Sequence, residues 1–351
     1  MLPYWFLFTL CAAGAVQYRT DLRRPVQGGP VLVIIGLLIL AMVGLRYEVG
    51  GDWINYVTIF NDLRYADLNE AIAEGDPGYT ALSWLALRIG ADIWFVNLIC
   101  AGFFTWGLVR FTRQQPNPWL ALCVAVPYLI IVVGMGYTRQ AVAIGFMLAG
   151  MSEFRRHHSM LRFGVYIVAG ALFHKTAIIV LPIVAFAATR NRWIMIGLGG
   201  VLGAVLYYML LNAEIDTLMT NYVEAEYDAQ GAAIRVSMNV IPAVTFLIFQ
   251  RRFGMDDFDR QLWRNFSLAA LGALVLLIVS PSSVVVDRLA LYLIPLQLVV
   301  FSRLPFAFAK GGTPNGLLTI GVIAYSAAVQ FVWLTQATHA DYWLPYKIWF
   351  I

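Results

Sequence analysis

Charged residues are scarce in this sequence. They make up 13% of the 351 residues, against about 25% in an average soluble domain. Hydrophobic residues make up 60%, and the mean hydropathy is +0.72. A soluble domain has no way to cover that much apolar surface, whereas lipid covers it. The composition therefore predicts an all-α, polytopic integral membrane protein.

Cysteine is also rare, and soluble segments are lacking. The three cysteines, Cys11, Cys100 and Cys123, lie in apolar segments without metal-ligand spacing, so we interpret them as small buried hydrophobic residues. No stretch resembles a soluble domain, a linker or an internal repeat, which predicts a single integral domain over 1–351. The N-terminal apolar segment has no basic region before it, so we interpret it as a first span and not a signal peptide.

Apolar segments that are long enough for short or tilted spans recur along the whole chain. The twelve predicted spans are 3–18, 30–46, 91–110, 118–134, 138–154, 160–173, 175–189, 193–212, 235–250, 265–282, 288–302 and 316–334. Most Lys and Arg residues fall in alternate loops, which the positive-inside rule places in the cytoplasm. Both termini are therefore expected outside, and in a bacterium this means the periplasmic side of the inner membrane.

The segment 162–190 admits two interpretations. A single long helix would leave Lys175 unpaired inside the membrane and would put later arginine clusters outside. Two short spans avoid both costs. We therefore predict a helical hairpin with its external tip at about His174 and Lys175.

The predicted external loop, 47–90, is too apolar for a solvated loop. WINYVTIF (53–60) and YTALSWLALRI (79–89) have helical spacing of apolar residues, as amphipathic helices in the membrane interface do. Trp53 and Trp84 are expected at headgroup depth. The segment between them, ADLNEAIAEGDPGY, is polar and rich in turn residues. Such a loop suits a substrate with a lipid tail; the alternative is a structural cap over the bundle.

Several basic residues lie outside, against the positive-inside rule. A lone arginine at a helix end is usually ion-paired or reaches to the interface, but six such residues on one face fit a phosphate or pyrophosphate ligand. They are Arg46, Arg139, Lys175, Arg235, Arg288 and Lys347. We predict a pyrophosphate site made by Arg46, Arg139, Arg235 and Arg288, with Lys175 in support.

Two external groups are candidates for a general base. Asp52 follows the Gly50–Gly51 turn, near the membrane surface; its alternative role is to cap the helix that begins after it. His174 carries an imidazole, the side chain that most often serves as a general base, and adjoins Lys175; its alternative role is structural. Asp52 is the first choice and His174 the second.

These motifs resemble the EpsG family of bacterial exopolysaccharide proteins, which are related to Wzy-type polysaccharide polymerases. The first element is Arg46-x-x-x-Gly50-x-Asp52, with Tyr56 four residues later. The further elements are Gly78–Tyr79, Arg139–Gln140, Phe173–His174, Arg288 with Tyr292, and the C-terminal Trp343–Lys347. Lys175 departs from the family pattern, in which a small or polar residue is expected beside the histidine.

The resemblance implies polymerisation of oligosaccharide repeat units that are carried on undecaprenyl pyrophosphate at the external face of the inner membrane. Asp52 and His174 would be catalytic. The further substrate-binding candidates are Tyr56, Tyr79, Gln140, Asp287, Tyr292, Tyr346 and Lys347, with Asp287 expected to orient Arg288. We expect metal-independent glycosyl transfer without a cofactor, because the sequence has no carboxylate cluster typical of a divalent-metal site.

The partners implied are the lipid-linked oligosaccharide, membrane lipids, and the chain-length regulator and flippase of the same pathway, with no nucleic acid. Two alternatives to a polymerase stay open. One is a transporter or flippase of lipid-linked glycans, which would want ionisable groups near the bilayer midplane. The other is a glycan ligase, which moves finished glycan to a different acceptor.

Overall fold

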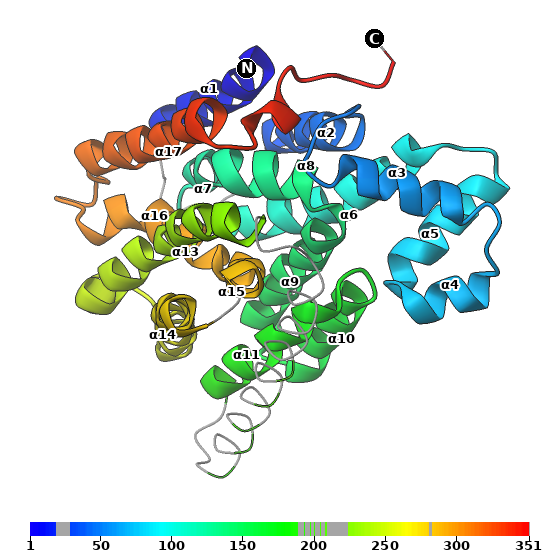
Figure 1. Ribbon diagram of the computed structural model, residues 1–351. Helices are drawn as coiled ribbons and strands as arrows, with labels where there is room; N and C mark the ends of the chain where they lie inside the picture. The colour runs from blue at the N-terminus through cyan, green and yellow to red at the C-terminus, as the bar shows by residue number, and fades with distance from the viewer. Residues whose placement is uncertain are drawn as a thin grey trace. The chain divides into compact units, whose positions relative to one another are not determined.

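The computed structural model describes residues 1–18, 29–188, 224–280 and 283–350, with isolated positions between 193 and 208 and backbone alone over 224–230. Every regular element in these ranges is a helix (Figure 1), so the all-α prediction is confirmed. The helices form two compact units. Unit 1 comprises Met1–Ala177 and Asn315–Ile351, and unit 2 comprises Ile178–Pro314. That the chain is one integral domain stays a prediction.

The helices of unit 1 fall into a bundle and a set of loop helices. The bundle contains α1 (Leu2–Gln17), α2 (Pro30–Gly44), α6 (Ile93–Thr112), α7 (Pro118–Ala125), η1 (Val126–Val133), α8 (Gly134–Gly136), α9 (Thr138–His157), α10 (Met160–Ala171) and α17 (Gly316–Gln336). The loop between α2 and α6 contains α3 (Trp53–Asp62), α4 (Leu68–Glu74) and α5 (Pro77–Arg88). The tail after α17 contains the short helix η5 (Ala340–Trp343).

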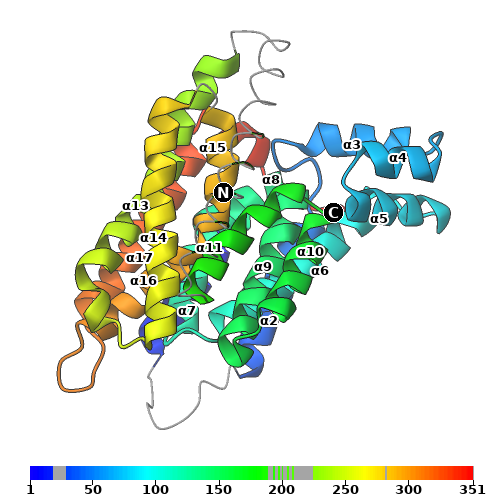
Figure 2. The ribbon, with the colours of Figure 1, turned by 90° about the horizontal axis from the view of Figure 1, so that it is seen from below.

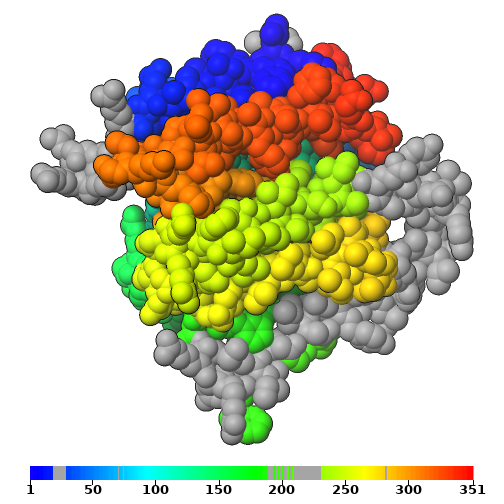
Figure 3. Space-filling model, turned by 90° about the vertical axis from the view of Figure 1, so that its left-hand side faces the viewer, coloured from blue at the N-terminus to red at the C-terminus, as the bar shows by residue number. Residues whose placement is uncertain are grey.

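The continuous segment α7–η1–α8 is the core of unit 1. Nearly all of it is buried, as expected of a helix that is apolar on every side. Pro127 is the second residue of the π-helical stretch η1, because proline cannot donate the usual backbone hydrogen bond. Helix α17 lies along α1 beside this core (Figure 3).

Helices α6, α9 and α10 run side by side (Figure 2). Glycines set the distance between the first two. A Cβ at Gly107 would lie 1.9 Å from the carbonyl oxygen of Gly145, so the backbones of α6 and α9 touch. Such close approach is typical of small residues in membrane helices.

The two ends of unit 1 differ in charge. At one end, Asn117 donates to the Ala15 carbonyl at 3.0 Å, and Arg110 pairs with Glu153; we call it the basic end, because Arg113, Arg155 and Arg156 are also there. At the other end, Tyr4 Oη donates to the Trp343 carbonyl at 2.8 Å. The N-terminus of α1 and the C-terminal tail therefore share one end, which we call the loop face. Which end is cytoplasmic stays a prediction.

The loop helices partly match expectation. Helices α3 and α5 form at the predicted amphipathic segments, but α4 forms where only turns were predicted. Asp67 starts α4 by accepting from the Asn69 amide at 2.8 Å, a capping interaction typical of helix starts. Trp53, Tyr56, Phe60 and Tyr79 are buried against α6, so the loop is a packed layer over that helix.

The short helix η2 (Lys175–Ile179) crosses the boundary between the units in the sequence, and the further helices belong to unit 2. These are α11 (Val180–Ala188), α13 (Glu224–Phe249), η3 (Gln250–Arg252), α14 (Asp257–Val279), α15 (Ser283–Ala290), η4 (Leu291–Leu293) and α16 (Pro295–Ala307). Asn239 links α13 to both α15 and α16. Its amide donates to the Ala290 carbonyl at 2.9 Å and its oxygen accepts from Gln297 at 2.7 Å.

The predicted count of twelve spans is not confirmed. Five described helices are long and apolar enough to cross a membrane, and α15–η4 with α16 forms a sixth span if its 45° bend is accepted. Four more apolar helices are shorter. The predicted span 193–212 lies almost entirely outside the described residues. These long apolar helices identify the chain as a membrane protein.

Candidate functional site

The first motif residue, Arg46, is buried at the loop face with 1% of its surface exposed. Its Nε donates to the Val49 carbonyl at 3.1 Å, and its Nη1 donates to the Val43 carbonyl. Its Nη2 donates to Thr138 Oγ1 at 2.7 Å and to Asn97 Oδ1 at 3.3 Å. Each guanidinium nitrogen is thus engaged with the protein, and Arg46 fastens the turn after α2 to α6 and α9.

The structure explains why the same motif has a glycine at position 50. Its φ is +109°, which side chains rarely allow, and a Cβ there would lie 2.2 Å from the Met135 carbonyl oxygen. The turn therefore presses directly on the end of α8. This contact fixes the position of Asp52 and of the start of α3.

The motif element Arg139 meets a residue that the sequence did not single out, Asp76. Arg139 Nη1 donates to Asp76 Oδ2 at 2.8 Å, and His174 Nδ1 lies 3.8 Å from the same oxygen. We call Asp76, Arg139 and His174 the Asp76 cluster. The side chain of Asp76 is 9% exposed, against 33% for Arg139 and 21% for His174. The buried carboxylate thus binds Arg139 and lies near His174, whose Nδ1 makes no hydrogen bond among the described residues.

Asp76 was missed because it lies in the polar segment that was interpreted as turns, directly before Pro77 at the start of α5. Its side chain makes no capping hydrogen bond within the described part of the chain. The carboxylate is instead directed at Arg139. The only sequence signal was its place next to the Gly78–Tyr79 element.

The break after α10 brings His174 to the cluster. Helix α10 ends at Ala171, so the interruption predicted at 174–175 is present. The Gly78 amide donates to the Leu172 carbonyl at 2.7 Å, and a Cβ at Gly78 would lie 3.0 Å from the Phe173 ring. The Gly78–Tyr79 and Phe173–His174 elements are therefore in direct contact, and the missing side chain of Gly78 permits it.

Two tyrosines lie beneath the cluster. The guanidinium carbon of Arg139 is 5.7 Å from the Tyr56 ring centre, and the Tyr56 and Tyr79 rings are 5.4 Å apart. Burial raises the pKa of both hydroxyls, and the charge of Asp52 raises the pKa of Tyr56 further. Both tyrosines are therefore neutral. Among the described residues, the buried Tyr79 hydroxyl has no hydrogen-bond partner.

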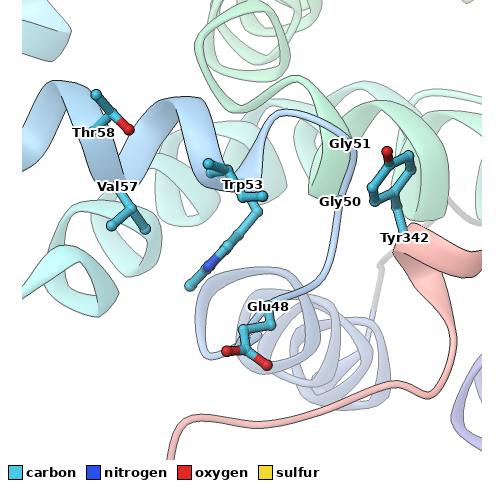
Figure 4. Close-up of a pocket in the computed structure, with 8 residues that line it drawn as sticks. Glu48, Gly50, Gly51, Trp53, Val57, Thr58 and Tyr342 are labelled. Atoms are coloured by element: carbon cyan, nitrogen blue, oxygen red, sulfur yellow. The ribbon is translucent and has the colours of Figure 1, made fainter.

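Asp52 is the residue before α3, but its side chain makes no capping hydrogen bond to that helix as far as the structure describes it. The cap role that the sequence left open is therefore not what this carboxylate does. Asp52 follows Gly51, which lines a cavity of about 310 Å³ at the loop face with Glu48, Trp53 and Tyr342 (Figure 4).

The C-terminal tail closes over the same turn. Lys347 Nζ pairs with Glu48 Oε2 at 2.5 Å, and Tyr346 Oη donates to the Met42 carbonyl at 3.0 Å. The Tyr47 amide donates to the Lys347 carbonyl at 3.0 Å. Tyr346 and Lys347 thus hold the tail in place, and their substrate-binding role stays a prediction.

The remaining predicted residues divide between the units. In unit 2, Arg235 Nε donates to Asp287 Oδ1 at 2.8 Å; that Asp287 also orients Arg288 stays a prediction. Tyr292 is fully buried. In unit 1, Gln140 is buried beside Arg139, and Lys175 is exposed.

Comparison with known proteins agrees with these motifs. The model of the EpsG family matches residues 31–348, nearly the whole chain. The chain belongs to the EpsG family. No curated protein and no solved structure is significantly similar to it.

Membership confirms the resemblance and gives a coarse function. The EpsG family suggests an exopolysaccharide-related polymerase function and a bacterial membrane location. The matched region runs from α2 into the tail. It therefore contains both the Asp76 cluster of unit 1 and the Arg235–Asp287 pair of unit 2.

Proposed function

We propose that this EpsG-family protein polymerises oligosaccharide repeat units carried on undecaprenyl pyrophosphate. In each step the bond from the anomeric carbon of the growing chain to the pyrophosphate oxygen breaks. A hydroxyl at the non-reducing end of the next unit forms the new glycosidic bond, and its proton passes to a general base. Undecaprenyl pyrophosphate leaves. The observation that carries the proposal is the Asp76 cluster, which combines a base, a cation and a carboxylate at one face of a membrane protein.

His174 is our first candidate for the general base. Its Nδ1 faces Asp76 at 3.8 Å, which leaves Nε2 to accept the proton of the acceptor hydroxyl. A carboxylate behind an imidazole orients the ring and stabilises the imidazolium that forms. Asp52 was the first choice from sequence, and its lack of a cap bond within the described residues keeps it as the second candidate.

Arg139 is our main candidate for the pyrophosphate. One arm of its guanidinium binds Asp76, and a third of its side chain is exposed. A planar guanidinium held in this way can offer its other nitrogen to phosphate oxygens without losing its position. The exposed Lys175 lies next to His174 in the chain and adds a second charge. Arg235 and Arg288 are further candidates from unit 2.

Arg46 has a positioning role in this proposal. Its donors are engaged with Val43, Val49 and Thr138, and displacing them would leave buried oxygens without partners. It holds the turn that carries Asp52. A ligand at the Asp76 cluster would gain from this rigidity without touching Arg46.

The test is incubation of the purified protein with a single undecaprenyl-pyrophosphate oligosaccharide. A ladder of products of increasing length is the expected result. A single transfer to a second kind of acceptor would show a ligase. If no product forms but the protein moves the lipid-linked oligosaccharide across the membrane of a vesicle, it is a transporter. Either outcome would overturn the proposal.

The same assay tests whether His174 is the general base. His174→Ala should stop the ladder, whereas the matched variant His339→Ala, an exposed histidine of the tail, should leave it intact. If His174→Ala elongates as the wild type does and Asp52→Asn does not, the base is Asp52.

A further inference from the structure

A second cavity of unit 1 lies far from the Asp76 cluster. It has a volume of about 680 Å³ and runs between α2 and α6. This volume is within the range of about 300–1,000 Å³ that is typical of small-molecule sites. Its walls change in character along its length, from apolar in the middle of the helices to basic at their ends.

The apolar part is made by Leu37 and Leu40 of α2 and by Trp106 of α6. Leu37 is 58% exposed and Trp106 is 42% exposed, although both are large and hydrophobic. Gly102 gives the groove its depth, since a Cβ there would meet only Leu40, at 3.7 Å.

The basic part is made by Arg110, Arg113 and Arg156, with Gln114 between them in the lining. Arg110 pairs with Glu153 and lies 5.9 Å from the Trp106 ring centre. The Nε atoms of Arg110 and Arg113 are buried and have no hydrogen-bond partner among the described residues. Buried donors of this kind normally have a partner. The groove therefore ends in arginines that retain unmet capacity to bind an anion.

We propose that this groove holds one anionic phospholipid. Its phosphate binds Arg113 and Arg156, and an acyl chain lies along Leu37, Leu40 and Gly102. The long apolar part matches an acyl chain, and the arginines complement a headgroup with net negative charge. Trp106 lies between the two parts, as aromatic residues do at membrane interfaces.

The lipid-linked substrate does not fit this groove. The arginines are at the basic end of unit 1, whereas Asp76, Arg139 and His174 are at the loop face, at opposite ends of α9. An isoprenoid carrier whose pyrophosphate sat at Arg113 would hold its sugar away from the cluster. The groove is therefore a site for a resident membrane lipid and is independent of the proposed polymerase.

The test is native mass spectrometry of the purified full chain, titrated with phosphatidylglycerol or with zwitterionic phosphatidylcholine. One phosphatidylglycerol should bind tightly and phosphatidylcholine weakly. In the double variant R113Q/R156Q, affinity for phosphatidylglycerol should fall roughly tenfold or more, since each basic residue adds to the attraction. Gly102→Leu should weaken the binding of both phospholipids, because its side chain fills the groove. If Gly102→Leu does not fold, R113Q/R156Q still tests the proposal.

The matched control is Arg162→Gln. Arg162 is at the same end of unit 1 and pairs with Glu153, but the groove lining does not contain it. Its loss should leave phosphatidylglycerol binding unchanged. Equal binding of both phospholipids, an equal loss in Arg162→Gln and the double variant, or displacement of the bound lipid by an equimolar amount of undecaprenyl phosphate would overturn the proposal.

Discussion

Arg139 on α9 donates to the carboxylate of Asp76, the residue that precedes α5, at 2.8 Å. This single contact joins the loop helices to the bundle at the point where His174 also arrives. An exposed ion pair would contribute little, but Asp76 is 8% exposed, and loss of either partner leaves a desolvated group behind. The pair is therefore both a structural joint and the centre of the proposed site.

Asp76→Asn should lower elongation at least about a hundredfold, the usual scale of a lost acid–base contribution. The amide keeps the size of the side chain but can neither orient the imidazole of His174 nor stabilise its charged form. The rate is measured from the product ladder. Asp62→Asn, an exposed change at the end of α3, serves as the control. Wild-type elongation by Asp76→Asn would remove the cluster from the mechanism.

Arg139→Lys should retain membrane abundance but lose most polymer. Lysine keeps the charge that Asp76 needs, yet it lacks the planar fork that binds a carboxylate and a phosphate at once. The effect should be largest on the apparent KM for the lipid-linked donor. Polymer is measured by gel and protein by immunoblotting of membranes. Full polymer length with Arg139→Lys would show that one point charge is enough.

Gly50→Ala should destabilise the protein by at least about 1–2 kcal/mol, the cost of forcing a side chain into the left-handed region. The clash with the Met135 carbonyl adds to this. Gly51→Ala is the matched control, because a Cβ at Gly51 meets only Trp343, at 3.6 Å. The midpoint of thermal unfolding in detergent compares the two variants. Equal midpoints would contradict the close contact between the turn and α8.

Local patterns in the sequence predicted the local structure well. The apolar spacing of 53–60 and 79–89 predicted α3 and α5, because periodicity reports directly on helical faces. The interruption at 174–175 followed from the cost of burying Lys175. The three cysteines are buried and free, as expected. In each case the physical cause lies within a few residues of the segment concerned.

Tertiary partners could not be predicted in this way. Arg46 was predicted to bind pyrophosphate because external arginines are disfavoured, and the sequence could not show that its guanidinium donates hydrogen bonds to Val49 and Thr138. Asp76 was not singled out because its partner, Arg139, is 63 residues away in the chain. Helix α4 was missed because its polar sequence resembles a turn until Asp67 caps it.

The pair Glu48–Lys347 should make attachment of the tail sensitive to acid. The hydrogen bond that Lys347 donates to Glu48 lowers the pKa of the Glu48 carboxyl. A carboxyl with a lowered pKa in the folded state contributes stability above its ordinary pKa of about 4.3, and this is lost as pH falls through the lowered value. Hydrogen exchange of the Tyr47 amide, which donates to the Lys347 carbonyl, should therefore become less protected only in acid.

Glu48→Gln is the variant that tests this dependence. It should remove the acid-dependent loss of protection at Tyr47, whereas Asp341→Asn, a change of another exposed carboxyl of the tail, should retain it. Persistence of the acid effect in Glu48→Gln would assign it to a different group.

The orientation of unit 1 can be tested at its two charged ends. Lys175 is exposed next to the Asp76 cluster, and Arg156 is exposed at the basic end. The native cysteines Cys11, Cys100 and Cys123 are buried, so a cysteine placed at 175 or 156 should label over a low background. We expect position 175 to react with an impermeant maleimide in intact spheroplasts and position 156 to react only after permeabilisation. The reverse pattern would put the Asp76 cluster in the cytoplasm, where a polymerase that uses outward-flipped substrates could not work.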